Sequence, residues 1–190
     1  MIRRLIQKNR SYRRFYQNFA VNERTLKELV NLARLSPSAA NLQPLKYILS
    51  NTPENNSIIF SCLRWAGYLK DWPGPKEGER PSAYIIILGD TKITKSFGCD
   101  HGIAGQSILL GAANKGLGGC MVGSIERERL RSALKIPSDF ESLLVIALGK
   151  PKEKVVIEEI PKGGNIKYWR DNRKIHHVPK RKLEEIILDL

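Results

Sequence analysis

The 190-residue chain has few cysteines and few histidines, and each shortage argues against a class of protein. Its three cysteines, Cys62, Cys99 and Cys120, are odd in number and widely separated, and no C-x-x-C pair occurs. We therefore expect reduced thiols in a cytosol rather than a disulfide framework or a zinc site. His176 and His177 are adjacent, so their side chains point in different directions and make a poor metal pair.

Long apolar runs are also missing. The longest, Ile85–Leu88 and Leu143–Leu148, have the length of strands rather than of membrane spans. The N-terminus reaches Arg3 and Arg4 at once, which leaves no apolar stretch long enough for a secretory signal. We expect a soluble, cytoplasmic protein that does not associate with a membrane.

Acidic residues are in the minority, 19 against 32 lysines and arginines, so the net charge is +13. A surface of this charge attracts nucleic acid, anionic membranes or phosphate-bearing cofactors. The basic residues are concentrated toward the tail, 162–182, without the interleaved aromatic residues on which single-stranded bases stack. A solvated basic face is therefore favoured over a nucleic-acid-binding module, which would bind oligonucleotides in a salt-sensitive way.

Common catalytic and phosphate-binding motifs are absent too. Gly111 and Gly116 have the spacing of a phosphate loop but are followed by Leu117 instead of lysine, and no G-x-G-x-x-G follows an expected strand. Without a nucleophile elbow, a hydrolase is not expected. Gly116, Gly118 and Gly119 indicate a helix end and a tight turn, with close backbone approach to a flat ligand as the alternative.

What the chain does contain is hydrophobic periodicity that alternates between helix and strand. The apolar runs 83–88 and 142–148 are expected to be neighbouring central strands, covered on both faces. Asn22, Thr52 and Ser124 are the expected helix N-caps. The expected helices are 23–35, one that begins at Pro53, 98–115, 125–135 and 183–190, the last with Ile186 and Ile187 facing inward. The other expected strands are 45–50 and 117–122, and 71–81 is an expected loop.

This order of elements predicts an α/β (α+β) fold in which helices cover a central mixed sheet. A chain of this length suits one domain, 1–190, whose residues 151–190 form a basic C-terminal extension.

Several segments carry a more specific signal. They are R-S-x-R-x-F at 10–15, S-P-S-x-x-N-x-Q-P at 36–44, and D-x-G-x-A-x-Q and G-L-G-G-C-M-x-G within 100–123. In this order they resemble the nitroreductase family over nearly the whole chain, and the tail 168–181 resembles the closing segment of its shorter members. Two departures are Asn9, where many members have arginine, and Leu45, where many have tryptophan.

The resemblance implies a homodimer with FMN shared between the subunits. The dianionic phosphate of FMN needs arginine forks and hydroxyl donors, so Arg10, Ser11 and Arg13 are its first expected ligands. Lys180 and Arg181 match the family's C-terminal basic pair and are expected to return to the same phosphate. The alternative leaves these two as solvated charges.

The remaining expected site residues fall into three groups. Those near the flavin's ribityl chain or ring edge offer a turn with amide and hydroxyl groups: Pro37, Ser38, Asn41 and Gln43. The alternative, helix termination, explains the proline but not the amides. Those lying against the flavin are Gly119, Cys120 and Met121. Those able to stack on a planar substrate are Trp65, Tyr68 and Trp72. The alternative places the first two in the core.

The activity implied by the resemblance is ping-pong chemistry, in which NADH or NADPH reduces the flavin and an electron-poor acceptor such as a nitroaromatic or quinone reoxidises it. The flavin carries the reaction, so no separate catalytic residue and no metal are expected. The apolar helix from Gly98 onward is the expected subunit contact. The alternative is a flavin-binding or flavin-processing protein without nitroreductase activity, since fold does not fix function.

Overall fold

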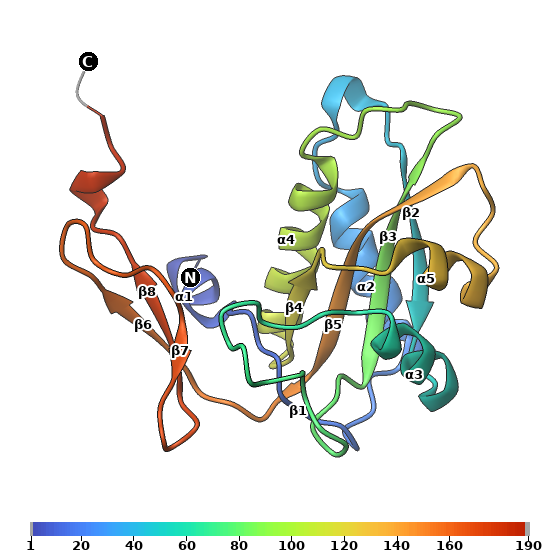
Figure 1. Cartoon of the computed structure of the whole chain (residues 1–190). Helices are drawn as coiled ribbons and strands as arrows, with labels where there is room; N and C mark the ends of the chain where they lie inside the picture. The colour runs from blue at the N-terminus through green and yellow to red at the C-terminus, as the bar shows by residue number, and fades with distance from the viewer. Residues whose placement is uncertain (1, 189–190) are drawn as a thin grey trace.

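The computed structural model describes residues 2–188 (Figure 1). The α-helices are α1 (Ile2–Lys8), α2 (Glu23–Arg34), α3 (Pro53–Ser61), α4 (Asp100–Asn114) and α5 (Arg127–Leu134). The strands are β1 (Phe15–Tyr16), β2 (Leu45–Ser50), β3 (Ala83–Asp90), β4 (Gly118–Val122), β5 (Phe140–Pro151), β6 (Val155–Glu159), β7 (Trp169–Arg170) and β8 (His176–Lys180). Among the helices of this described part, none is long and apolar enough to cross a membrane.

Strand β5 lies at the centre of the main sheet. It pairs with β3 on one side and with β4 and β1 on the other, and β2 forms the outer edge beyond β3. These ladders are antiparallel, and a bridge between Ser11 and Gly119 adds a parallel pairing. The prediction that strands 83–88 and 142–148 are neighbours in one sheet is thereby confirmed.

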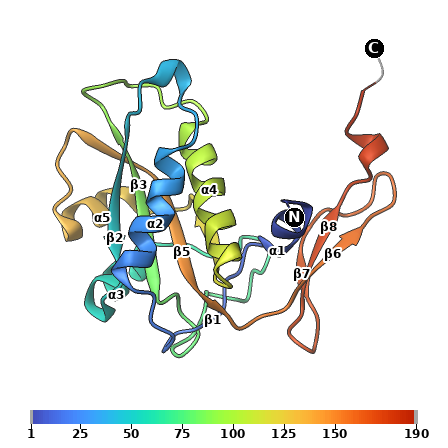
Figure 2. The same cartoon turned by 180° about the vertical axis from the view of Figure 1, so that it is seen from behind.

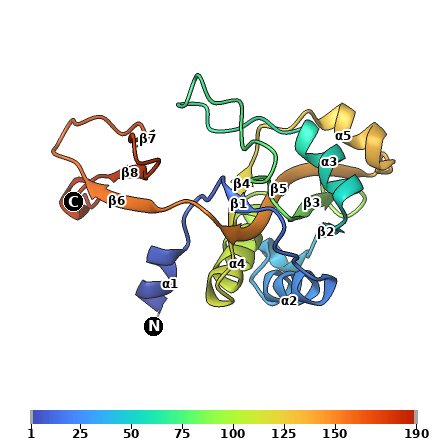
Figure 3. The same ribbon diagram turned by 90° about the horizontal axis from the view of Figure 1, so that it is seen from below.

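Helices cover both faces of this sheet, α2 and α4 on one side and α3 and α5 on the other (Figure 3). Successive strand residues point to opposite faces. In β3, Ile85 and Ile87 therefore join the core under α2 and α4, while Tyr84 and Ile86 join the core under α3 and α5. Burial on both faces explains why this strand is apolar without alternation.

Two helices begin where the capping residues in the sequence predict. The Asn22 side chain accepts a hydrogen bond from the backbone N–H of Thr25 at 2.8 Å, and α2 begins at the next residue. Thr52 caps α3 in the same way, with Pro53 at the first helical position.

The small residues of α4 are explained by packing within the chain. A Cβ on Gly111 would lie 2.3 Å from Leu32 of α2, and one on Gly105 would lie 3.0 Å from Met121 of β4. The glycines thus let α4 approach both its neighbouring helix and the sheet.

Ser124 does not cap α5, contrary to expectation. The helix begins three residues later with Glu126 as the N-cap residue. Ile125 is buried and pairs with Leu63 in an isolated β-bridge, and the Ser124 carbonyl accepts a hydrogen bond from Arg64. These long-range contacts hold the segment extended, so the helix begins only after it.

The described part of the extension, residues 151–188, contains a second sheet that the sequence pattern does not predict. Strand β8 pairs with β6 in parallel and with β7 antiparallel. This sheet lies beside α1, away from the helices that cover the central sheet (Figures 1 and 2).

The prediction of an amphipathic helix at 183–190 is wrong for the described residues. Only a 3₁₀ turn, Leu183–Glu185, forms, and Ile186 and Ile187 are exposed rather than inward. The chain has already left the small sheet there, so these side chains pack against no apolar surface formed by residues 2–188. Residues 189 and 190 of the expected helix lie outside the described part.

Candidate functional site

A cavity of about 350 Å³ lies where the N-terminal segment meets α4, β4 and β8. We call it the basic pocket. Residues far apart in the chain line it, and they include five of the expected cofactor ligands. These are Arg10, Ser11, Arg13, Met121 and Lys180.

Backbone pairing fixes the N-terminal segment at this pocket. The Tyr12 N–H donates to the carbonyl of Gly119 at 2.9 Å, next to the bridge between Ser11 and Gly119. Neighbouring Gly118 lies so close that a Cβ would come within 2.5 Å of the Tyr12 ring. Gly118 and Gly119 therefore belong to a strand rather than to the expected turn, and they allow segment 10–13 to approach β4 closely.

The basic pocket contains buried polar atoms without protein partners. Arg10 Nε and His176 Nδ1 make no hydrogen bond within residues 2–188. Burial, reinforced by the nearby Arg13 guanidinium, lowers the pKa of His176 to about 4, so the ring is neutral at pH 7. Its Nε2 lies 3.3 Å from Arg13 Nη1 and can only accept from that cation, so the proton is assigned to Nδ1. The sequence did not single out His176 as a site residue.

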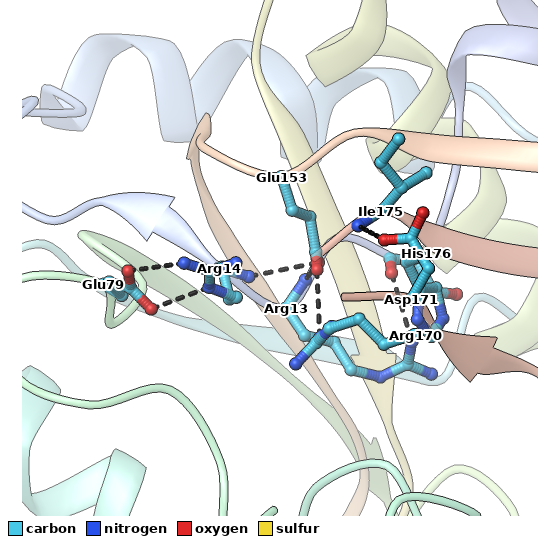
Figure 4. A network of polar contacts seen from close by, with 9 residues as sticks. Arg13, Arg14, Glu79, Glu153, Arg170, Asp171, Ile175 and His176 are labelled. Atoms are coloured by element: carbon cyan, nitrogen blue, oxygen red, sulfur yellow. Dashed lines mark hydrogen bonds and ion pairs between the residues drawn. The ribbon is translucent and has the colours of Figure 1, made fainter. Parts of the chain in front are cut away.

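Glu153 ties the N-terminal segment to the C-terminal extension (Figure 4). Its side chain is fully buried, and its carboxylate accepts hydrogen bonds from the backbone N–H groups of Arg13 and Arg14. It also forms an ion pair of 3.1 Å with Arg170 of β7. One carboxylate thus holds three positive or donor groups beside the basic pocket.

A second ion pair supports the same segment from the other side. Arg14 donates two hydrogen bonds of 2.7 Å to Glu79, a bidentate geometry (Figure 4). The Arg14 guanidinium accordingly lowers the pKa of the Glu79 carboxyl to about 2. Arg13 and Arg14 therefore point to different partners, and only Arg13 lines the basic pocket.

The loop 37–43 lies at a different cavity, of about 170 Å³, which Pro37, Ser38 and Gln43 line together with Asp100. Asn41 and Gln43 are exposed, and both have positive φ angles, 54° and 51°. Such angles are uncommon for residues with a side chain and are often found at functional sites. This loop shares no lining residue with the basic pocket of the same chain.

Asp100 holds this loop in place. Its buried carboxylate accepts hydrogen bonds from Ser38 Oγ at 2.6 Å and from the Ala39 backbone N–H at 3.1 Å. The sequence placed Asp100 in a motif without giving it a role.

Replacing Asp100 with asparagine is expected to lower the free energy of unfolding by about 1–3 kcal/mol, because one of the two donors then loses its acceptor in a buried place. Urea unfolding of the purified protein measures the change. Asp71→Asn, a matched substitution at an exposed loop residue, is the control and should change stability little. Equal unfolding midpoints for the two variants would contradict this role.

The three expected substrate residues have different surroundings. Trp65 is half-buried and lies against Gly74 and the Phe60 ring, as a core residue does. Tyr68 is half exposed and lies 4.9 Å from Tyr168, ring centre to ring centre.

The Tyr168 ring also lies 5.2 Å from the His176 ring, centre to centre, and Tyr168 lines the basic pocket, so Tyr68 is connected to that pocket through one aromatic ring. Trp72 packs against the Arg170 guanidinium at 4.6 Å.

The remaining expected ligands lie next to the basic pocket or away from it. Cys120 is buried in β4 and lines an adjoining cavity that also touches Arg13 and Met121. Burial raises the pKa of its thiol, so it is protonated at neutral pH. Arg181 is exposed and lies 4.0 Å from Glu185, whereas Lys180 faces the pocket.

Comparison with known proteins decides the family. The model of the nitroreductase family matches residues 6–61 and 80–150, which is more than half of the chain. The chain belongs to the nitroreductase family. The matched ranges contain the N-terminal segment, the 37–43 loop, α4 and β4, whereas the second sheet lies beyond them.

Individual members of the nitroreductase family give a closer comparison. A candidate NADH dehydrogenase/NAD(P)H nitroreductase of Methanothermobacter thermautotrophicus is 30% identical over 78% of this chain and 76% of its own. The 5,6-dimethylbenzimidazole synthase of Rhodospirillum rubrum is 22% identical over 93% of this chain and 92% of its own. The solved structure of an FMN-dependent nitroreductase from Clostridium difficile R20291 superposes with a TM-score of 0.65 at 25% identity, covering 79% of this chain and 87% of that one.

Proposed function

We propose that this nitroreductase-family protein is a cytoplasmic FMN-dependent NAD(P)H oxidoreductase that reduces electron-poor acceptors such as nitroaromatics or quinones. The observation that carries the proposal is the basic pocket. It gathers two guanidinium groups, a hydroxyl and an ammonium group from the two ends of the chain, beside a glycine-containing strand.

The pocket fits the phosphate end of FMN. A phosphate carries close to two negative charges and accepts several hydrogen bonds, and Arg10, Arg13 and Lys180 offer cations with donors on one cavity. Arg10 Nε is a buried donor that no described residue accepts from, which is the condition expected for a ligand-binding donor. A volume of about 350 Å³ is within the usual range for cofactor and ligand sites.

Bound FMN would supply the redox chemistry, accepting hydride from NADH or NADPH and passing two electrons to the acceptor. The chain's part is to bind and orient. Arg10, Ser11, Arg13, Lys180 and Arg181 are proposed to hold the phosphate. Gly119, Cys120 and Met121 are proposed to lie against the ring, and Tyr68, Trp65 and Trp72 to border the substrate space.

A second copy of the chain is proposed to complete the site, in a homodimer of single-domain subunits. Pro37, Ser38, Asn41 and Gln43 line or flank a cavity separate from the basic pocket, so they would act on the flavin held by the partner subunit. Large apolar side chains on α1 and at the C-terminal end are exposed, which suits burial against a second subunit. They are Ile2, Ile6, Leu183, Ile186, Ile187 and Leu188.

The alternative is a flavin-binding or flavin-processing protein. It is favoured by one specific observation, the similarity to a 5,6-dimethylbenzimidazole synthase over nearly the whole length of both chains.

The absorbance spectrum of the purified protein tests the proposal. We expect bound FMN, identified by chromatography after release, that bleaches on anaerobic addition of NADH or NADPH and recovers on addition of a quinone or nitroaromatic compound. FMN that neither donor bleaches would favour binding or processing. Failure to bind FMN would contradict the assignment of the basic pocket.

A further inference from the structure

The loop 62–82 joins α3 to β3 and reaches from α3 toward the second sheet (Figures 1 and 3). In its first part, Trp65 and Ala66 line a cavity of about 120 Å³ together with residues of β4. This cavity shares Arg13 and Met121 with the basic pocket, so the two cavities adjoin. The position of the loop therefore sets the shape of the space next to the proposed phosphate site.

The middle of this loop, segment 66–73, has few hydrogen bonds to the rest of the protein. Within residues 2–188 it makes one hydrogen bond outside itself, in which the Tyr68 N–H donates to Tyr168 Oη at 3.4 Å. Its other hydrogen bonds are backbone turns within the segment. A segment with so few bonds to its surroundings opens at a low cost in free energy unless side chains hold it.

Two aromatic contacts supply such a hold, and both are with the C-terminal extension. The Tyr68 ring lies 4.9 Å from the Tyr168 ring, centre to centre, with the planes tilted by 53°. The Trp72 ring lies 4.6 Å from the Arg170 guanidinium. Both kinds of contact are attractive at these distances. The segment 66–73 is therefore attached to β7 and the residue before it.

The same two residues of the extension also contact the N-terminal segment. The Arg13 guanidinium lies 4.9 Å from the centre of the Tyr168 ring, and Tyr168 lines the basic pocket. Arg170 pairs with Glu153, whose carboxylate accepts from the Arg13 backbone N–H. The Tyr168 ring thus contacts the proposed phosphate ligand Arg13 and the loop residue Tyr68 at the same time.

We propose that Tyr168 is a positioning residue for the reaction, which holds segment 66–73 against the site and thereby determines how tightly the electron acceptor binds beside FMN. This inference rests on the proposed function, because the acceptor site is formed next to bound flavin. The ring provides most of the hold, since it makes both contacts, whereas a hydrogen bond of 3.4 Å is weak. Tyr168→Phe should therefore resemble the wild type, and Tyr168→Leu should not.

Hydrogen exchange of the full-length protein freed of flavin, followed by mass spectrometry, tests the hold without any redox chemistry. We expect the amides of 66–73 to exchange about 3- to 10-fold faster in Tyr168→Leu than in the wild type, because losing the ring contacts raises the population of the opened segment. Trp169→Leu is the matched control. It removes the neighbouring exposed ring, which stacks on His177 at 3.9 Å, and should leave this exchange unchanged.

Steady-state kinetics with FMN in excess tests the positioning role. Tyr168→Leu should raise the KM for a quinone acceptor by about 3- to 10-fold with a smaller change in kcat, and Tyr168→Phe should restore the wild-type KM. A double-mutant cycle with Tyr68→Leu should be non-additive, because Tyr168 acts through Tyr68. The double variant should then have a KM no higher than that of the more affected single variant.

Three results would overturn the proposal. Equal exchange of 66–73 in Tyr168→Leu and Trp169→Leu would mean that the Tyr168 ring does not hold the loop. Faster exchange with an unchanged KM, or an additive cycle, would mean that Tyr168 does not position the acceptor through Tyr68. A wild type without FMN would overturn the proposed function and with it the effect on KM. Equal exchange overturns the hold on the loop alone, so the two failures are distinguishable.

Discussion

Replacing Glu153 with glutamine is expected to lower the free energy of unfolding by about 3–5 kcal/mol, the cost of breaking a buried ion pair. The fully buried carboxylate pairs with Arg170 and accepts from the backbone of Arg13 and Arg14. A neutral amide leaves the Arg170 guanidinium without its counter-ion and turns an NH₂ group toward other donors.

Urea unfolding followed by circular dichroism measures this change, with Glu159→Gln as the matched control. Glu159 is exposed and lies 3.7 Å from Lys182, so its loss should change stability by less than about 1 kcal/mol. FMN affinity should also fall in the Glu153 variant, because the carboxylate positions Arg13. If the two glutamine variants unfold at the same urea concentration, the Glu153 carboxylate does not hold the extension to the rest of the fold.

Replacing Arg10 with glutamine is expected to weaken FMN binding by about 10- to 100-fold, the equivalent of one or two charge-assisted hydrogen bonds. Titration of the apoprotein, followed by the change in flavin fluorescence, measures the dissociation constant. Arg24→Gln, which removes an arginine exposed on α2, is the control and should bind FMN as the wild type does.

Riboflavin makes the second test sharper, because it has the same ring and ribityl chain as FMN but no phosphate. Arg10→Gln should bind riboflavin as tightly as the wild type does, since the lost interaction is with the phosphate. Equal weakening for both flavins would mean that Arg10 acts on the fold or the ring, and the phosphate assignment would be wrong.

The Arg10 and Glu153 experiments test two different parts of the proposed phosphate site. Arg10 tests a direct contact with the proposed cofactor, whereas Glu153 tests the buried charge that keeps the N-terminal segment and β7 together. Figure 4 shows the second of these, in which the Arg13 backbone N–H and the Arg170 guanidinium meet at the Glu153 carboxylate.

Residues close in sequence could be assigned from sequence alone. Asn22 and Thr52 cap helices through bonds to residues three positions later, so the signal and its partner lie in one short window. Strand 45–50 has the bounds expected for it. The resemblance to the nitroreductase family is confirmed, and its motifs between residues 10 and 123 lie within the ranges that the family model matches, whereas the tail 168–181 lies beyond them.

Several errors have one cause, contacts between distant residues. Ser124 has the residue type of a cap but is held extended by the segment at Leu63. Ile186 has helical spacing but is exposed, because no apolar surface among the described residues covers it. The second sheet went unpredicted because its strands are short and rich in polar residues, and β6 and β8 pair in parallel across a long connection.

The sequence by itself determined the family, the core strands and the capped helices, since these depend on periodicity, caps and motifs that lie within short stretches of chain. Only the tertiary structure brought Arg10 and Lys180 to one pocket, buried Glu153 among arginines, and lowered the pKa of His176. The physical reason is that burial and electrostatic pairing are properties of residues brought together by folding, and neither can be read from the sequence near any one of them.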